Sequence, residues 1–175
     1  MLDYRQIARV RLDQPFGMAN GGWAYDNYPE LDTLDAHTRI TIANLDGPGV
    51  VTCIHSTQHG IWANDLKALK SSSYYTRGVL IEVFYDGAAE PAVRVPLGDF
   101  FADGAGGLAK HFTSLFVEKA PESYNCFIPL PFARAIKIDL INETDQDLSN
   151  YSFVEWHRLP NWEADFGYLH ATWHR

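Results

Sequence analysis

One stretch, Val79–Phe101, constrains the fold more than any other part of the chain. Its first residues, VLIEVFY, alternate between two faces with the two-residue period of a β-strand. Asp86-Gly87 follows and supplies the positive φ angles that a tight turn needs. A second alternating run, VRVPL, comes next, and a Gly-Asp pair ends it. The stretch therefore predicts an antiparallel hairpin, and it contains no catalytic signature.

Short strand-like runs recur along most of the chain, separated by turn residues. The turn DGPG indicates that the two runs on either side of it form a second hairpin. Trp62–Leu69 is the best short helix. Helices between the strands, which a parallel α/β fold needs, are missing. The pattern predicts an all-β fold, a single jelly-roll β-sandwich of about eight antiparallel strands with one short helix. The other expected strands are Ile7–Leu12, Arg39–Leu45, Val50–Thr57, Asn125–Phe132, Ala135–Ile141, Tyr151–Trp156 and Gly167–Arg175.

The chain of 175 residues is long enough for one well-cored domain and too short for two ordinary ones. We expect residues 1–38 to form an N-terminal strand and an arm, and residues 39–175 to form the roll. The arm is rich in glycine and aromatic residues, so it is either a loop that contacts a ligand or partner, or an arm packed on a neighbouring subunit. Its key residues are Asn20, Gly21, Gly22, Trp23 and Tyr25.

The net charge of −8 and the isoelectric point near 5.2 argue against nucleic acid and anionic membranes as partners. The sequence shows neither a signal peptide nor an apolar run long enough to span a membrane, so we expect a cytoplasmic protein. Cys53 and Cys126 lie in apolar strand-like runs, and two buried free thiols are the simplest interpretation. No motif indicates a cofactor.

Catalytic chemistry has only weak candidates in this sequence. Glycoside hydrolysis requires two facing carboxyl groups, one of them with a raised pKa. His55 and His59 are four residues apart, but they straddle the end of a predicted strand, so we do not predict a metal site there. Neither cysteine has the basic neighbours that activate a thiol. The acidic residues placed near turns or strand ends are Asp99, Asp103, Glu143 and Glu155.

Five segments of the sequence resemble glycoside hydrolase family 172, and the most specific of them reads DGPGV followed by YDG…P…VPLGDFF. The glycine-rich residues of the N-terminal arm look like a degenerate form of a motif of that family. The matching segments are Ala43–His55, Gly78–Phe101, Tyr124–Phe132, Ala135–Glu143 and Gly167–Arg175.

The resemblance implies a jelly roll of the kind that this family carries twice in tandem. The family assembles as trimers with six rolls around an axis, similar to double-jelly-roll viral capsid proteins. Its paired catalytic glutamates lie in the second roll, in motifs resembling G-E-G-E and G-T-E-D, and neither motif occurs in this sequence. The chain resembles the first roll, so no residue receives a catalytic role by this comparison.

We therefore expect a self-assembling, non-catalytic jelly-roll protein, structural or carbohydrate-binding, whose main partner is itself. A hexameric ring is the favoured assembly, a trimer comes second, and higher assembly of a capsid-like kind is a further prospect. The alternative is a glycoside hydrolase acting on furanosides, with a carboxylate pair assembled across subunits or with a partner chain.

Overall fold

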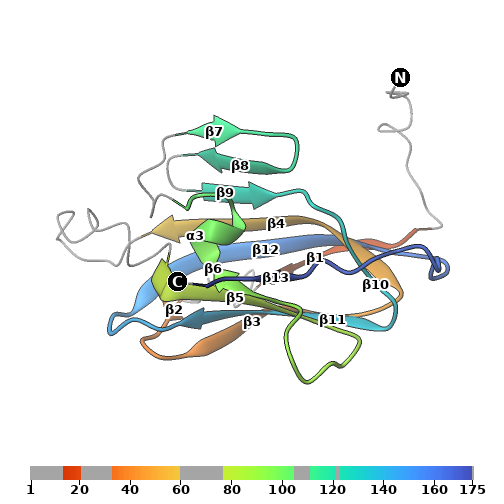
Figure 1. The fold of residues 1–175 in the computed structure, drawn as a ribbon, viewed down its shortest axis with the longest axis horizontal. Helices are drawn as coiled ribbons and strands as arrows, with labels where there is room; N and C mark the ends of the chain where they lie inside the picture. The colour runs from red at the N-terminus through yellow and green to blue at the C-terminus, as the bar shows by residue number, and fades with distance from the viewer. Residues whose placement is uncertain (1–13, 21–32, 60–76, 105–110, 121–122, 175) are drawn as a thin grey trace.

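The computed structural model describes residues 14–20, 33–59, 77–104, 111–120 and 123–174. They form an all-β sandwich of two sheets, as the sequence predicts (Figure 1). The elements in chain order are β1 (Phe16–Asn20), β2 (Thr33–Leu34), β3 (Arg39–Asp46), β4 (Gly49–His59), β5 (Val79–Tyr85), β6 (Val93–Pro96), α3 (Leu97–Phe100), β7 (Phe112–Thr113), β8 (Val117–Ala120), β9 (Ser123–Cys126), β10 (Leu130–Phe132), β11 (Ala135–Asn142), β12 (Leu148–Arg158) and β13 (Ala171–Thr172).

The larger sheet has eight strands in the order β1-β12-β4-β9-β8-β7, with β10 also paired to β4 and β2 to β12. The smaller sheet has five strands in the order β13-β6-β5-β11-β3. The chain passes between the two sheets repeatedly, as it does in a jelly roll. Neighbouring strands are antiparallel throughout, except that β13 runs parallel to β6.

The core lies between the two sheets and is filled by the inward residues of both. On β5 the alternation predicted from the sequence holds, since Val79, Ile81, Val83 and Tyr85 are all buried. Phe101, just after α3, is fully buried and stacks on Tyr124 of β9 with 5.1 Å between ring centroids. These contacts tie α3 to the larger sheet.

The β5–β6 hairpin forms, but its connection is longer than a tight turn. Asp86 and Gly87 do adopt the predicted positive φ angles of 57° and 79°. The strands, however, first pair at Val83 and Val93, so the turn opens a wider loop. Asp86 joins this loop to the start of β11, because its Oδ1 accepts hydrogen bonds from the backbone N–H groups of Arg134 and Ala135 at 2.6 and 3.0 Å.

Three local predictions were wrong. The second expected hairpin does not form, because β3 lies in the smaller sheet and β4 in the larger one, so the DGPG turn crosses between the sheets. The run Asn125–Phe132 is split into β9 and β10, as its two prolines allow. In the C-terminal segment, only Ala171–Thr172 is a strand.

The one helix described, α3, stands where the sequence suggested only a break after VRVPL. The predicted helix Trp62–Leu69 and the predicted strand Ile7–Leu12 lie outside the described residues. Cys53 and Cys126 are buried free thiols, as expected. In the described part of the chain, no helix has the length and apolarity needed to cross a membrane.

Candidate functional site

The most concentrated set of charges lies on the outer face of the five-stranded sheet. Glu82 of β5 and Asp139 of β11 are directly opposite each other in the strand register. Their exposed fractions are 1% and 0%, although they point away from the hydrophobic core. Arg39 joins them, because its Nη1 donates to Glu82 Oε2 and to Asp139 Oδ2, each at 2.6 Å. Two carboxylates are therefore held together by one guanidinium group.

Further cationic and hydroxyl groups complete the shell around these two carboxylates. Arg94 Nη1 donates to the second oxygen of Glu82 at 2.7 Å. Lys137 Nζ lies 2.8 Å from Asp139 Oδ2, and Thr41 Oγ1 donates to Asp139 Oδ1 at 2.8 Å. All four carboxylate oxygens thus have a partner, and the three cations are what this face presents to solvent. We call this set of six residues the charge ladder.

The charge ladder does not have the electrostatics of a general acid. Burial alone would raise the pKa of Asp139, but hydrogen bonds from Lys137, Arg39 and Thr41 outweigh burial and lower it. A glycosidase acid needs the opposite shift. The geometry fits a cross-strand polar clamp that holds β3, β5, β6 and β11 in register.

The four acidic residues singled out from the sequence lie in separate places, and none faces another as a carboxyl pair. Glu155 is exposed on the outer face of the larger sheet, opposite Cys53 in the register. Glu143 is half exposed at the end of the charge ladder, with its Oε1 3.8 Å from Arg94 Nη2. Asp99 on α3 binds Arg77 through both oxygens at 3.1 Å.

Asp103 is the one predicted acidic residue that is fully buried. Its Oδ2 binds the ammonium group of Lys119 and accepts a hydrogen bond from Tyr124 Oη at 2.7 Å. Burial and the adjacent Asp103 carboxylate raise the pKa of Tyr124. Asp103 Oδ1 is buried with no hydrogen-bond partner. This buried ion pair joins the segment that follows α3 to β8 and β9 of the larger sheet.

A hollow of about 570 Å³ opens beside the Asp86 turn. Tyr168 donates a 2.5 Å hydrogen bond to Asp86 Oδ2, and its ring stacks on Trp162 with 5.5 Å between centroids. Arg134 and His170 stand at the rim of the hollow. Aromatic, acidic and basic groups at one opening are features of small-ligand sites, so this hollow is a candidate ligand site on the described surface.

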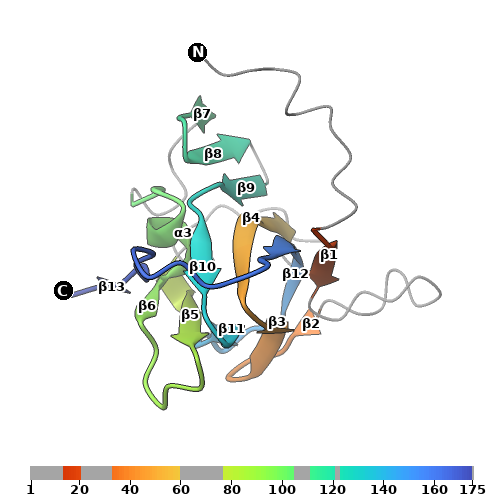
Figure 2. The ribbon, with the colours of Figure 1, turned by 90° about the vertical axis from the view of Figure 1, so that its right-hand side faces the viewer.

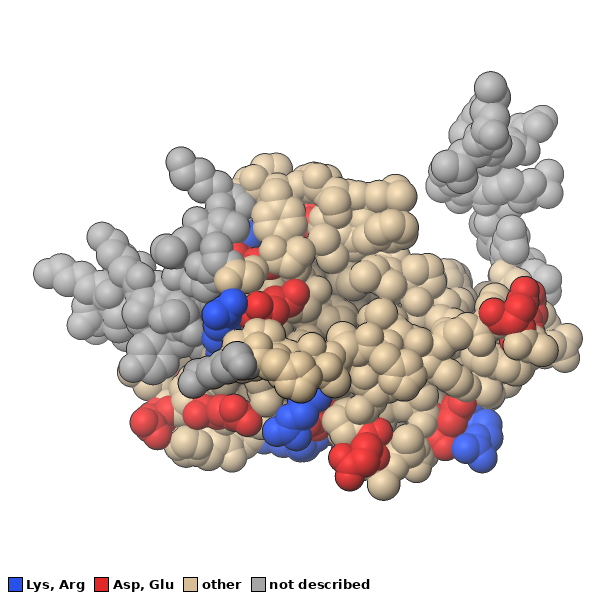
Figure 3. Space-filling model, viewed as in Figure 1, with Lys and Arg blue, Asp and Glu red and all other residues tan. Residues whose placement is uncertain are grey.

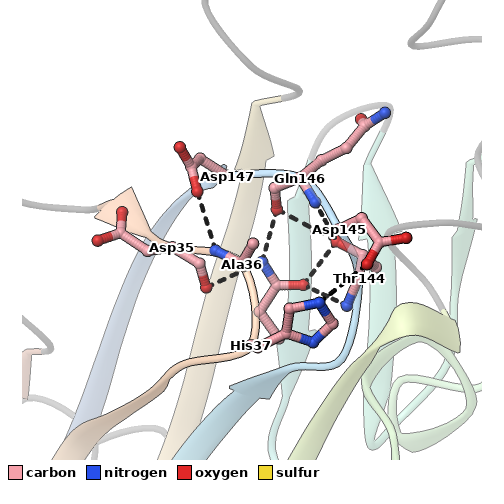
Figure 4. A network of polar contacts seen from close by, with 8 residues as sticks. Asp35, Ala36, His37, Thr144, Asp145, Gln146 and Asp147 are labelled. Atoms are coloured by element: carbon pink, nitrogen blue, oxygen red, sulfur yellow. Dashed lines mark hydrogen bonds and ion pairs between the residues drawn. The ribbon is translucent and has the colours of Figure 1, made fainter.

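At the opposite end of the sandwich from the Asp86 turn, polar contacts join two loops (Figure 4). We interpret these contacts as structural. The buried amide of Asn142 donates to the carbonyl oxygens of Leu34 and Gln146 at 2.9 and 2.7 Å. His37 Nε2 lies 2.9 Å from Asp145 Oδ1, but both side chains are largely exposed. An exposed ion pair of this kind adds little stability, so Asn142 is the residue that fixes these loops.

Most of the predicted loop and part of the histidine pair lie outside the described residues. Asn20 ends β1 and pairs with Phe153, whereas Gly21, Gly22, Trp23 and Tyr25 lie outside the described residues, as does the side chain of His59. Both ring nitrogens of His55 have partners, Asn125 Oδ1 and Thr57 Oγ1, each at 2.7 Å. The residues that the structure describes contain no group of three or more potential metal ligands.

Large hydrophobic side chains are exposed at two places on the eight-stranded sheet. Leu115 and Phe116 in the β7–β8 turn are 80% and 50% exposed, and Phe127, which follows β9 and bonds to the backbone of Phe116, is 42% exposed. On the edge strand β1, Phe16 and Met18 are 76% and 59% exposed. We call the first group the hairpin patch and the second group the edge patch. In Figure 3 the surface over β7, β8 and β9 is mostly uncharged, whereas charged residues gather below, over β3, β5 and β11.

Comparison with known protein families assigns the chain to one of them. The family model described as GH172 domain-like matches residues 30–154, which include β2 through most of β12. This chain belongs to the GH172 family. The resemblance inferred from the sequence segments is thereby confirmed. No curated protein matches the chain significantly. The match covers the charge ladder, Asp99, Asp103 and the hairpin patch, whereas the edge patch and Glu155 lie outside it.

The charge ladder was missed by sequence reasoning, although a signal for it was present. Glu82 and Asp139 each interrupt an otherwise apolar strand, and Arg39 and Arg94 are placed on outward faces by the alternation. Only the strand register brings the four charges into contact. That register depends on which strands are neighbours in the sheet, which the local pattern does not contain.

Proposed function

We propose that this GH172-family chain is a non-catalytic structural protein that assembles with copies of itself. The exposure of five large hydrophobic side chains, in the hairpin patch and the edge patch, carries this proposal. Contiguous exposed apolar groups of this kind mark interaction surfaces in soluble proteins. With a net charge of −8, copies repel one another over most of their surface, so contact through uncharged patches is favoured.

The expected assembly is a hexameric ring, with a trimer as the second choice. Six copies of one roll would take the places of the six rolls that surround the axis in the trimers of this family. Closed cyclic assemblies of this type bury the same patches in every copy. Two free buried thiols suit a cytoplasmic protein, and the acidic surface favours neither nucleic acid nor membrane as a partner.

The absence of catalysis is supported by how the described acidic groups are bound. Asp139 and Asp86 both have pKa values lowered by their hydrogen-bond donors, against the effect of burial. Asp103 is occupied by Lys119 and Tyr124. For Asp86 and Asp139 this lowering of the pKa is a shift opposite to the raised pKa that the general acid of a glycosidase requires.

Light scattering coupled to size exclusion tests the assembly directly. At micromolar concentration the protein should elute as one species with a mass several times the 19.8 kDa of one chain. A monomer across the whole concentration range would reject the proposal. Sheets or particles under electron microscopy would extend the assembly toward the capsid-like arrangement.

A glycoside hydrolase is the second candidate, and membership of the family favours it. In that case a carboxylate pair forms across subunits or with a partner chain, and the exposed Glu155 and Glu143 are the acids that we propose to take part. In this second candidate function, we assign the furanoside ring to the hollow beside Tyr168. Hydrolysis of arabino- or fructofuranosides by the assembled protein, lost in a Glu143→Gln or Glu155→Gln variant, would establish this function.

A further inference from the structure

One lysine and one aspartate of this chain are buried in contact with each other. Lys119 of β8 and Asp103, in the segment after α3, have exposed fractions of 5% and 0%. The ammonium nitrogen of Lys119 contacts Asp103 Oδ2. Lysine side chains normally keep their amino group in water. This pair instead places an amine and an acid together in a site from which bulk water is excluded.

The backbone holds both partners in place. The N–H group of Asp103 donates to the carbonyl oxygen of Gly98 at 2.7 Å, which closes the chain around α3. Lys119 is paired with Tyr124 of β9 in the strand register. Figures 1 and 2 show α3 next to the β8–β9 end of the larger sheet. The folded chain therefore positions the amine beside the carboxyl group, as an enzyme positions two reactants.

The two carboxyl oxygens of Asp103 have unequal surroundings. Tyr124 Oη donates to Oδ2 at 2.7 Å, whereas Oδ1 is buried with no hydrogen-bond partner among the described residues. A buried acceptor without a partner costs stability, and a buried ion pair is stable only when its remaining lone pairs are satisfied. An amide between Lys119 and Asp103 has a single oxygen, for which Tyr124 already supplies a donor. Amide formation therefore removes the unsatisfied atom.

Tyr124 also polarises the carboxyl group. Burial, together with the hydrogen bond to Asp103, raises the pKa of Tyr124, so its hydroxyl stays protonated at neutral pH. The Tyr124 ring stacks on Phe101 with 5.1 Å between centroids, and Lys119 Nζ lies 5.4 Å from its centre. A fixed O–H donor at a carboxyl oxygen stabilises the negative charge that develops there when an amine adds to the carbon.

We propose that Lys119 and Asp103 form an intramolecular isopeptide bond in the folded protein. A proton first passes from the ammonium group to the carboxylate, which gives a neutral amine and a neutral acid. Lys119 Nζ then attacks Cγ of Asp103, so that an N–C bond forms and one C–O bond breaks. That oxygen leaves as water with two of the three ammonium protons, so charge and atoms balance without a further reactant. Burial favours the condensation, because the ions lack hydration and the water that would reverse the reaction is kept out.

A second lysine–aspartate pair in the same chain provides an internal comparison. Lys137 Nζ lies 2.8 Å from Asp139 Oδ2, but the Lys137 side chain is 43% exposed. Both oxygens of Asp139 also have further partners, Arg39 and Thr41. This pair has neither the dry site nor the unsatisfied oxygen, so it stays an ion pair. The isopeptide bond does not depend on the proposed self-assembly, and either can fail without the other.

Intact-mass spectrometry of the denatured full chain tests the bond. The wild type should be lighter than its sequence mass of 19.8 kDa by about 18 Da, the mass of one water molecule. Lys119→Arg keeps the positive charge without a reactive amine, so it should have its full sequence mass. The matched control, Lys137→Arg, should keep the deficit. A tryptic digest of the wild type should contain one branched peptide with both Asp103 and Lys119, uncut after Lys119.

The branched peptide is measured on the wild type, so it does not depend on whether a variant folds. A wild type at its full sequence mass would overturn the isopeptide bond. Asp103 precedes Gly104, and an Asp-Gly bond can also lose water by closing to a succinimide. A deficit that persists in Lys119→Arg, or that digestion assigns to an unbranched peptide, would therefore overturn it as well.

Discussion

Glu82 and Asp139 lie directly opposite each other on neighbouring strands, and both are almost completely buried on the outer side of their sheet. Two like charges in that position repel each other unless a cation separates them. Arg39 provides that cation, with one nitrogen 2.6 Å from each carboxylate. Arg39 of β3 therefore links the carboxylates of β5 and β11 across the smaller sheet.

Replacing Arg39 with methionine should destabilise the protein, because it leaves the two carboxylates facing each other. We expect a loss of about 2–3 kcal/mol in the free energy of unfolding, less than for a fully buried pair, since Arg39 is half exposed and other cations remain. Urea unfolding at pH 7 measures this loss. Arg158→Met is the matched control, because Arg158 only reaches a backbone oxygen at 3.3 Å. Equal stability of the two variants would contradict the role given to Arg39.

Asp139 should make the free energy of unfolding depend on pH in the acidic range. Its pKa in the folded state is lowered below the ordinary value, so the unfolded chain binds a proton more readily. The stabilisation is then complete above about pH 5 and is lost as the pH falls below about 4, toward the lowered pKa. Urea unfolding between pH 7 and pH 2.5 should show a shallower decline in Asp139→Asn than in the wild type. Parallel pH profiles would contradict this assignment.

Replacing Lys119 alone should destabilise the protein more than replacing Lys119 and Asp103 together. Lys119→Met leaves the fully buried carboxylate of Asp103 without its cation, which costs about 3–5 kcal/mol in comparable buried pairs. Adding Asp103→Asn should recover much of the loss, because the charge is gone and Tyr124 can still donate to the amide oxygen. The double-mutant cycle is measured by urea unfolding. Additive losses in the double variant would show that the two side chains are not coupled.

Cys53 should react slowly with thiol reagents in the folded protein. Burial, and then the nearby charge of Glu155, raise the pKa of Cys53 to about 11. The thiolate fraction at pH 8 is therefore about 100-fold below that of an ordinary thiol. Glu155→Gln should increase the rate of alkylation by iodoacetamide, and the urea-unfolded protein should react fast. A folded rate equal to the unfolded rate would contradict the buried, protonated thiol.

The strands with clean alternation were predictable from the sequence alone. Arg39–Asp46, Val79–Tyr85 and Ala135–Asn142 match their expected spans within a residue or so, because inward positions are apolar and turns bound them. Long-range pairing was not predictable in the same way. The turn between β3 and β4 looks like a hairpin turn locally, and only the packing of two sheets decides that the chain crosses between them.

For the candidate site, too, the local position of each residue was predictable from the sequence, but its neighbours in space were not. Asp99, Asp103, Glu143 and Glu155 were picked because each lies near a turn or strand end, but proximity in space requires the strand order. Glu82 was visible as an outward residue of an alternating strand, yet its burial by Arg39 and Arg94 comes from three different strands. Charged residues that interrupt apolar strands are the local signal to pursue.

Self-assembly is the central claim, and native mass spectrometry of the full chain at micromolar concentration tests it most directly. We predict a single dominant complex of six chains, with three chains as the second expectation, each chain contributing 19.8 kDa. A spectrum that contains only the 19.8 kDa monomer, under conditions where a known weak oligomer survives, would contradict the claim.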